Sequence, residues 1–141
     1  MKILVSACLL GENCKYSGGN NYNQAVCDFA RGHQVVLVCP EVLGGLPTPR
    51  CPAEIVQGVV TNKEGINVDR EFRAGAAKAL AIAKENGVEL AILQSRSPSC
   101  GVKEIYDGTF SRRLIAGDGV TAEALKAHGI TIYGESDAEK L

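Results

Sequence analysis

Apolar residues along the chain gather into short continuous runs, and longer stretches with helical spacing lie between them. Three such runs are Ile3 to Ala7, Gln34 to Val38 and Leu90 to Leu93. Runs of this length are typical of strands buried on both faces, as in a parallel sheet covered by helices. A fourth strand is predicted at Ile130 to Tyr133, after the glycine that ends the preceding helical pattern.

The stretches between the runs predict helices over residues 21–31, 69–86 and 121–128. The second is the clearest, because its apolar residues recur on one face and Asn86-Gly87 supplies a C-terminal stop. Thr121 is the expected N-cap of the third helix. Strands that alternate with helices predict an α/β fold, here a single three-layer Rossmann-like domain with a mostly parallel sheet.

Two segments depart from this alternation. Residues 59–68 carry apolar ends around Asn-Lys-Glu-Gly and predict a small hairpin insertion. Residues 103–118 predict an irregular connection with one polar turn at Asp107-Gly108. We expect residues 1–134 to form the domain and residues 135–141 to be a flexible tail.

Composition narrows the possible partners. The 141 residues include 15 basic and 16 acidic side chains, so no basic surface for a nucleic-acid backbone is expected. The apolar run at the N-terminus is too short for a membrane span and no cleavage signature follows it. These features indicate a cytoplasmic protein with no membrane partner.

The chain has six cysteines, and in a reducing compartment such residues indicate metal binding, catalysis or core packing rather than disulfides. Cys8 and Cys39 directly follow the first two predicted strands, and Cys100 lies a few residues after the third. The carboxyl ends of parallel strands meet at one edge of the sheet, where ligands bind. We therefore expect these three thiols to converge.

The sequence predicts less about the roles of the other three cysteines. Cys14 and Cys51 lie on the loops just beyond Cys8 and Cys39, and Cys27 lies in a predicted helix, where core packing is expected. The stretch CPEVLGGLPTPRCPAEI at 39–55 combines prolines with Gly44-Gly45, which predicts a rigid irregular path. Such a path can hold Glu41 and Arg50 toward the same crevice.

Three kinds of site remain open for Cys8, Cys39 and Cys100. They can be small buried hydrophobic residues, zinc ligands or ligands of an iron–sulfur cluster. Structural zinc usually takes closely spaced pairs such as CxxC, which are absent, and His33 and His128 are expected to be solvated or to cap helix ends. Cluster cysteines need no close pairing, and three ligands to a four-iron cluster leave one iron open, as in catalytic metal sites.

Four stretches of the chain carry a resemblance to a known family. They are SACLLGENCKYSGG (6–19), CPEVLGGLPTPRCPAEI (39–55), SRSPSCG (95–101) and IYDGTFSRRLIAGDGVTAEAL (105–125). Together they resemble the bacterial thiouracil desulfidase family over nearly the whole chain. The resemblance implies a [4Fe-4S] cluster bound by Cys8, Cys39 and Cys100, with Glu41 and Ser97 as catalytic residues beside it.

The implied reaction is a non-redox desulfuration of thiolated pyrimidine bases, from thiouracil to uracil and sulfide, with the substrate sulfur on the open iron. Glu41 would take a proton from the attacking water, which Ser97 would orient. Arg50, Arg96 and Tyr16 are possible contacts to the ring. The alternatives are a non-catalytic electron carrier or redox sensor, favoured if Cys14 or Cys51 supplies a fourth thiolate, and a zinc or thiol protein on the same fold.

Overall fold

The centre of the computed structural model, which describes all 141 residues, is a four-stranded parallel sheet. Its strand order is β2-β1-β5-β8. These strands are β1 (Lys2–Ser6), β2 (Gln34–Val38), β5 (Leu90–Leu93) and β8 (Thr131–Gly134). The predicted fold class is confirmed, with strand ends that differ from the sequence analysis by one residue at β1 and β8.

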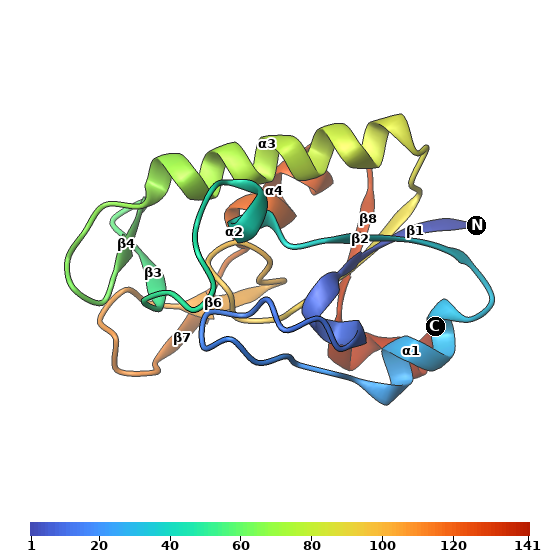
Figure 1. Cartoon of the computed structure of the whole chain (residues 1–141), viewed down its shortest axis with the longest axis horizontal. Helices are drawn as coiled ribbons and strands as arrows, with labels where there is room; N and C mark the ends of the chain where they lie inside the picture. Colours follow the sequence, from blue (N-terminus) through green and yellow to red (C-terminus); the bar gives the residue numbers. More distant parts are fainter.

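Helices cover both faces of the sheet and complete three layers. One face of the sheet carries α2 (Pro40–Leu43), α3 (Asp69–Glu85) and α4 (Val120–Ala127). The other face carries α1 (Gln24–Ala30) and two 3-10 helices, η1 (Ala7–Leu10) and η2 (Glu135–Lys140). In Figure 1, α3 runs along the top of the molecule and α1 lies at the bottom right.

Strand residues alternate between two hydrophobic clusters, as the pleat requires. Leu4, Ala91 and Leu93 pack toward α3 and α4. Their neighbours Ile3 and Val5 pack toward α1 and η2. The central strands β1 and β5 are buried on both faces and read as continuous apolar runs in the sequence, whereas the edge strand β2 leaves Leu37 42% exposed.

The predicted hairpin at 59–68 is present in a less regular form, and a regular hairpin precedes it. Residues 59–68 fold back through an isolated bridge between Thr61 and Asn67, with hydrogen bonds from Asn62 N to Ile66 O and from Val68 N to Val60 O, each at 2.9 Å. The regular two-stranded sheet joins β3 (Ala53–Val56) to β4 (Val59–Asn62). Gln57 and Gly58 have φ of 49° and 81° and form the two-residue turn. Positive φ at both central residues suits a tight hairpin, but Gln-Gly is a weaker sequence signal for it than Asn-Gly.

The connection at 103–118 is also more regular than predicted. It contains an antiparallel pair, β6 (Glu104–Tyr106) and β7 (Leu114–Ala116). Two backbone donors of the turn, Gly108 N and Phe110 N, bond to the buried Glu54 carboxylate at 3.0 and 3.1 Å. A carboxylate on the first hairpin therefore fixes the second one, a long-range contact that no local pattern reveals.

Residues after Gly134 are placed against the domain. Ala138 on η2 is 4% exposed within the cluster that includes residues of α1. The Glu135 carboxylate accepts hydrogen bonds from Ser95 N at 2.7 Å and Ser95 Oγ at 2.6 Å. The sequence analysis did not anticipate this packing, and the mobility of residues 135–141 stays a prediction.

None of the helices combines the length and the apolarity that a membrane span requires.

Candidate functional site

A crevice of about 980 Å³ opens at the carboxyl ends of β1 and β5. The chain leaves β1 toward β2 on one side and later returns to β5 on the other, so this is the point at which the strand order reverses. Ligands of open α/β sheets bind at such a point. The structure brings all five predicted site residues to this crevice, which is lined by Cys8, Glu41, Ser97, Cys39 and Cys100.

Cys8 and Cys39 lie on either side of Cys14. Cys39 Sγ is 3.6 Å from Cys14 O, and Asn21 Nδ2 donates to Cys8 Sγ at 3.5 Å. A hydrogen bond from the Cys14 thiol lowers the pKa of Cys39 to about 6 and also lowers the pKa of Cys8, against the opposing effect of burial. The pKa of Cys14 is raised, because its proton is held by these two sulfurs. One thiol has one proton, so it serves the two neighbours alternately.

Cys100 is more deeply placed. It is 5% exposed, and burial raises the pKa of its thiol to about 12, although hydrogen bonds with Ser6 and Ser99 partly oppose this. Cys100 is therefore a neutral thiol near neutral pH and Cys39 favours the thiolate, while the pKa of Cys8 is shifted in the same direction as that of Cys39. A positively charged metal centre is the kind of neighbour that deprotonates such a buried thiol.

The loop that carries Cys100 is fixed by the start of α4. Val120 N donates to Pro98 O and Thr121 N donates to Ser99 O, each at 2.8 Å. The Thr121 hydroxyl bonds to Ser99 Oγ at 2.8 Å. Thr121 is therefore not the N-cap that the sequence predicts; Gly119 occupies that position without a side-chain cap. The orphan donors of the helix are satisfied by the loop backbone instead.

Cys39 and Glu41 are positioned by α2, a short helix inside the stretch expected to be irregular. This helix lies unusually close to α3. A Cβ on Gly75 would lie 1.8 Å from Pro40 O, and one on Gly44 would lie 1.9 Å from Glu71 O. Gly44 has an ordinary φ of −77°, so it is required for this close approach rather than for an unusual backbone angle.

Glu41 and Ser97 face one another across the crevice. Glu41 Oε2 is paired with Arg50 at 2.5 Å, and Glu41 Oε1 lies 3.4 Å from Ser97 Oγ. Ser97 Oγ also accepts hydrogen bonds from Ser99 N at 3.0 Å and Cys100 N at 3.1 Å. A hydroxyl oxygen has two lone pairs, and both are used here. Ser97 can therefore only donate toward the crevice.

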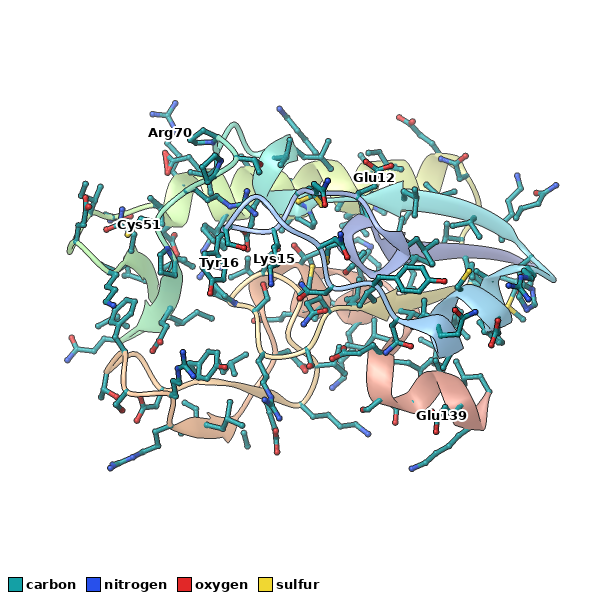
Figure 2. The ribbon with its side chains drawn as sticks, turned by 60° about the horizontal axis from the view of Figure 1, so that its bottom comes forward. Glu12, Lys15, Tyr16, Cys51, Arg70 and Glu139 are labelled. Carbon is teal, nitrogen blue, oxygen red and sulfur yellow. The ribbon has the colours of Figure 1, made fainter.

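Other residues named from the sequence have different places. Tyr16, which is 48% exposed, and Arg96 both line the crevice and remain available for a ligand. Cys51 also lines it but makes no sulfur contact, and Figure 2 shows it beside the hairpin of β3 and β4. Cys27 is half-buried on α1, so it is less enclosed than expected.

Sequence reasoning missed two residues that serve the site, and the two histidines lie away from it. Asn21 bonds to Cys8, and Ser6 Oγ accepts from Gln94 N at 3.0 Å, which joins the ends of β1 and β5. Ser6 opens the stretch 6–19 that carries the family resemblance, but no motif marks Asn21. His33 stacks on Phe29 with ring centroids 4.6 Å apart, and His128 is exposed, so neither contributes to the crevice.

The donor set fits a cluster better than a single ion. No group of three or more histidine, cysteine, aspartate or glutamate side chains is arranged to hold one metal ion. In an iron–sulfur cluster each thiolate binds a different iron, so the three sulfurs surround a volume rather than a point. Cys8, Cys39 and Cys100 all line the same crevice of about 980 Å³.

Fold and site together define the class of protein. It is a small three-layer α/β protein in which three cysteines, each following a strand of the parallel sheet, line one crevice. The chain belongs to the 2-thiouracil desulfurase family, whose model matches residues 3–137. It is 41% identical over 145 residues to the uncharacterized protein YbbK of Bacillus subtilis (strain 168), a match that covers 96% of each chain.

A solved structure is also similar. It is described as the [4Fe-4S]-dependent thiouracil desulfidase TudS, and it matches with a TM-score of 0.92 and 39% identity, over 99% of this chain and 94% of that one. The family resemblance stated from the sequence is thus confirmed.

Proposed function

We propose that this protein is an iron–sulfur enzyme that removes sulfur from thiolated pyrimidine bases and releases the oxo base and sulfide. The observation that carries this proposal is the match to TudS over 99% of the chain. The family match over residues 3–137 supports the same activity. Both comparisons favour an enzyme over the alternative of an electron carrier or redox sensor.

Cys8, Cys39 and Cys100 would hold a [4Fe-4S] cluster. They come from η1, from the N-cap of α2 and from the loop after β5, and all three line the crevice. A cluster with one iron free of protein ligands supplies a Lewis acid that suits the soft sulfur of a thiocarbonyl. The fit rests on the donor chemistry, since thiolates are the usual protein ligands of such clusters.

Glu41 and Ser97 would handle the water that replaces sulfur. Replacement of C=S by C=O consumes one water and releases hydrogen sulfide, so no electrons are exchanged. Glu41 Oε1 is the carboxylate oxygen free of Arg50 and is suited to take a proton from this water. Ser97, whose oxygen already accepts two backbone bonds, would turn its O–H from Glu41 Oε1 to the oxygen of the water and hold the water in place by this hydrogen bond.

The ring of the substrate would occupy the outer part of the crevice. Tyr16 and Arg96 line this region and have exposed side chains. An aromatic ring and a guanidinium group both stack on planar heterocycles. We therefore place the pyrimidine between these residues and the thiols.

The test is turnover by anaerobically reconstituted protein without added reductant. We expect brown protein with about four irons per chain, and equimolar release of sulfide and uracil from 2-thiouracil or 4-thiouracil. Removal of iron by a chelator should abolish the release, and renewed reconstitution should restore it. A cluster that assembles normally but releases no sulfide from any thiolated base or nucleoside would contradict the proposal.

A further inference from the structure

The Arg50 guanidinium is fully engaged within the protein. It has five N–H donors; four of them donate hydrogen bonds to protein oxygens, and Nη2 is in addition paired with Glu41 Oε2. Nε and Nη2 contact Glu41 Oε2 at 2.7 and 2.5 Å, and Nη2 also donates to Cys14 O at 2.9 Å. Nη1 donates to Pro47 O at 3.2 Å and to Thr48 Oγ1 at 3.0 Å. With 6% of its side chain exposed, Arg50 has no donor left for a substrate, so the ring contact considered from the sequence does not hold.

Both contacts to Glu41 end on the same carboxylate oxygen. A two-point fork between arginine and a carboxylate would occupy both oxygens. Here Oε2 takes both contacts, and Oε1 lies 3.4 Å from Ser97 Oγ. Arg50 therefore fixes one oxygen of Glu41 and leaves the other facing the crevice.

The arginine is itself anchored at two further places. Its backbone N donates to Tyr16 O at 2.7 Å, and its guanidinium bonds to Cys14 O and to the turn at 47–48. A glutamate side chain has several rotatable bonds, and its rotamer freedom is worth up to about 2 kcal/mol when it is lost. The bonds that two loops make with Arg50 hold its guanidinium in place, and this fixed partner offsets the entropy that Glu41 loses when its rotamer is fixed.

We infer that Arg50 is a positioning residue for the desulfuration, which acts by aiming Glu41 Oε1 at the water beside Ser97. This inference rests on the proposed function, in which Oε1 takes the proton. Arg50 touches neither substrate nor reacting atoms. Its effect on the reaction passes through Glu41 alone.

A purely structural role makes different predictions. If Arg50 only ties the loops together, its loss lowers cluster content and activity whether or not Glu41 is a carboxylate. If Arg50 acts through Glu41, its loss matters only while Glu41 can act. Coupling of this kind is what a double-mutant cycle measures.

The experiment compares Arg50→Gln, Glu41→Gln and the double variant, all reconstituted and assayed with 2-thiouracil. We expect wild-type iron content in each and an unchanged KM for Arg50→Gln. The kcat of Arg50→Gln should fall about 10²-fold, the loss that a misplacement of about 1 Å can cause. In the Glu41→Gln background, Arg50→Gln should change the rate by no more than about twofold.

Two controls keep the result interpretable. Arg50→Lys keeps the charge but cannot form all five bonds, so it should load iron and show a smaller fall in kcat. Arg73→Gln removes an arginine from an exposed pair on α3, where Arg73 Nε and Asp69 Oδ2 are 3.0 Å apart, and should leave kcat unchanged. A crystal structure of Arg50→Gln should show the Glu41 carboxylate rotated away from Ser97.

Wild-type kcat in Arg50→Gln, an equal fall in both backgrounds, or loss of iron in both Arg50 variants would overturn the inference. Failure of the proposed function looks different, because the wild-type protein would then release no sulfide.

Discussion

Five of the six cysteines of this protein divide into two groups that differ in what holds them, and the thiol of Cys14 bonds to two members of the first group. Cys8, Cys39 and Cys100 each follow a strand of the parallel sheet, and all line the crevice. Cys27 lies on α1, and Cys51 lies on the loop before β3 without a sulfur contact. The first group is fixed by the sheet edge, whereas the second depends on surface elements. The place of a thiol in the topology, rather than its residue type, marks it as a candidate ligand.

Replacement of one member from each group tests this division most strongly. Cys39→Ser should lose most of the iron and all sulfide release, because a hydroxyl is a poor substitute for a thiolate ligand. Cys51→Ser should keep about four irons per chain and near wild-type turnover. Iron analysis and sulfide release measure both effects. Iron loss in Cys51→Ser would place Cys51 among the ligands and contradict the division of the cysteines into these two groups.

A second test separates the thiols from the carboxylate that lies among them. Glu41→Gln should keep the cluster but lose general-base assistance, with a fall in kcat of about 10²–10⁴-fold. Its control is Glu12→Gln, since Glu12 is exposed on the loop after η1 and does not line the crevice. Steady-state kinetics on iron-matched samples provide the comparison. Equal rates for the two variants would remove Glu41 from the mechanism.

The smallest expected effect concerns the scaffold beneath Cys39. A methyl group at Gly75 would collide with Pro40 O, and overpacking of this kind usually costs about 1–3 kcal/mol. Gly75→Ala should therefore lower the free energy of unfolding in denaturant and weaken iron retention. Gly32→Ala is the matched control, because no atom lies within 4 Å of the added carbon. Similar unfolding curves for both variants would show that α2 can shift without penalty.

The central strands of the sheet were predictable because they are buried on both faces, and the edge strand β2 because its run is rich in β-branched residues. Runs such as Gln34–Val38 and Leu90–Leu93 can hardly be explained otherwise, and the structure has both with the predicted bounds. Convergence of Cys8, Cys39 and Cys100 followed from the geometry of parallel sheets. The two hairpins were harder, because their pairing depends on Glu54 and on left-handed residues such as Gln57, Phe110 and Arg112.

The finer geometry of the site was not predictable from the sequence. Glu41 lies on α2 and Arg50 lies nine positions later on the following loop, and nothing in their spacing says that the guanidinium has no donor left for the substrate. The role of Ser97 as a donor only became visible with the backbone bonds of Ser99 and Cys100. The thiol of Cys14 is placed between Cys8 and Cys39 by loops that carry no periodic pattern.

The anchoring of the Cys100 loop on α4 has a consequence for biosynthesis. The loop bonds to residues 119–121, which leave the ribosome some twenty residues after Cys100 itself. A nascent chain that ends before this point can present the first two thiols in order, but its third remains on an unanchored segment. The third thiol thus reaches its final place only when α4, the last α-helix of the chain, has folded against the loop that carries it.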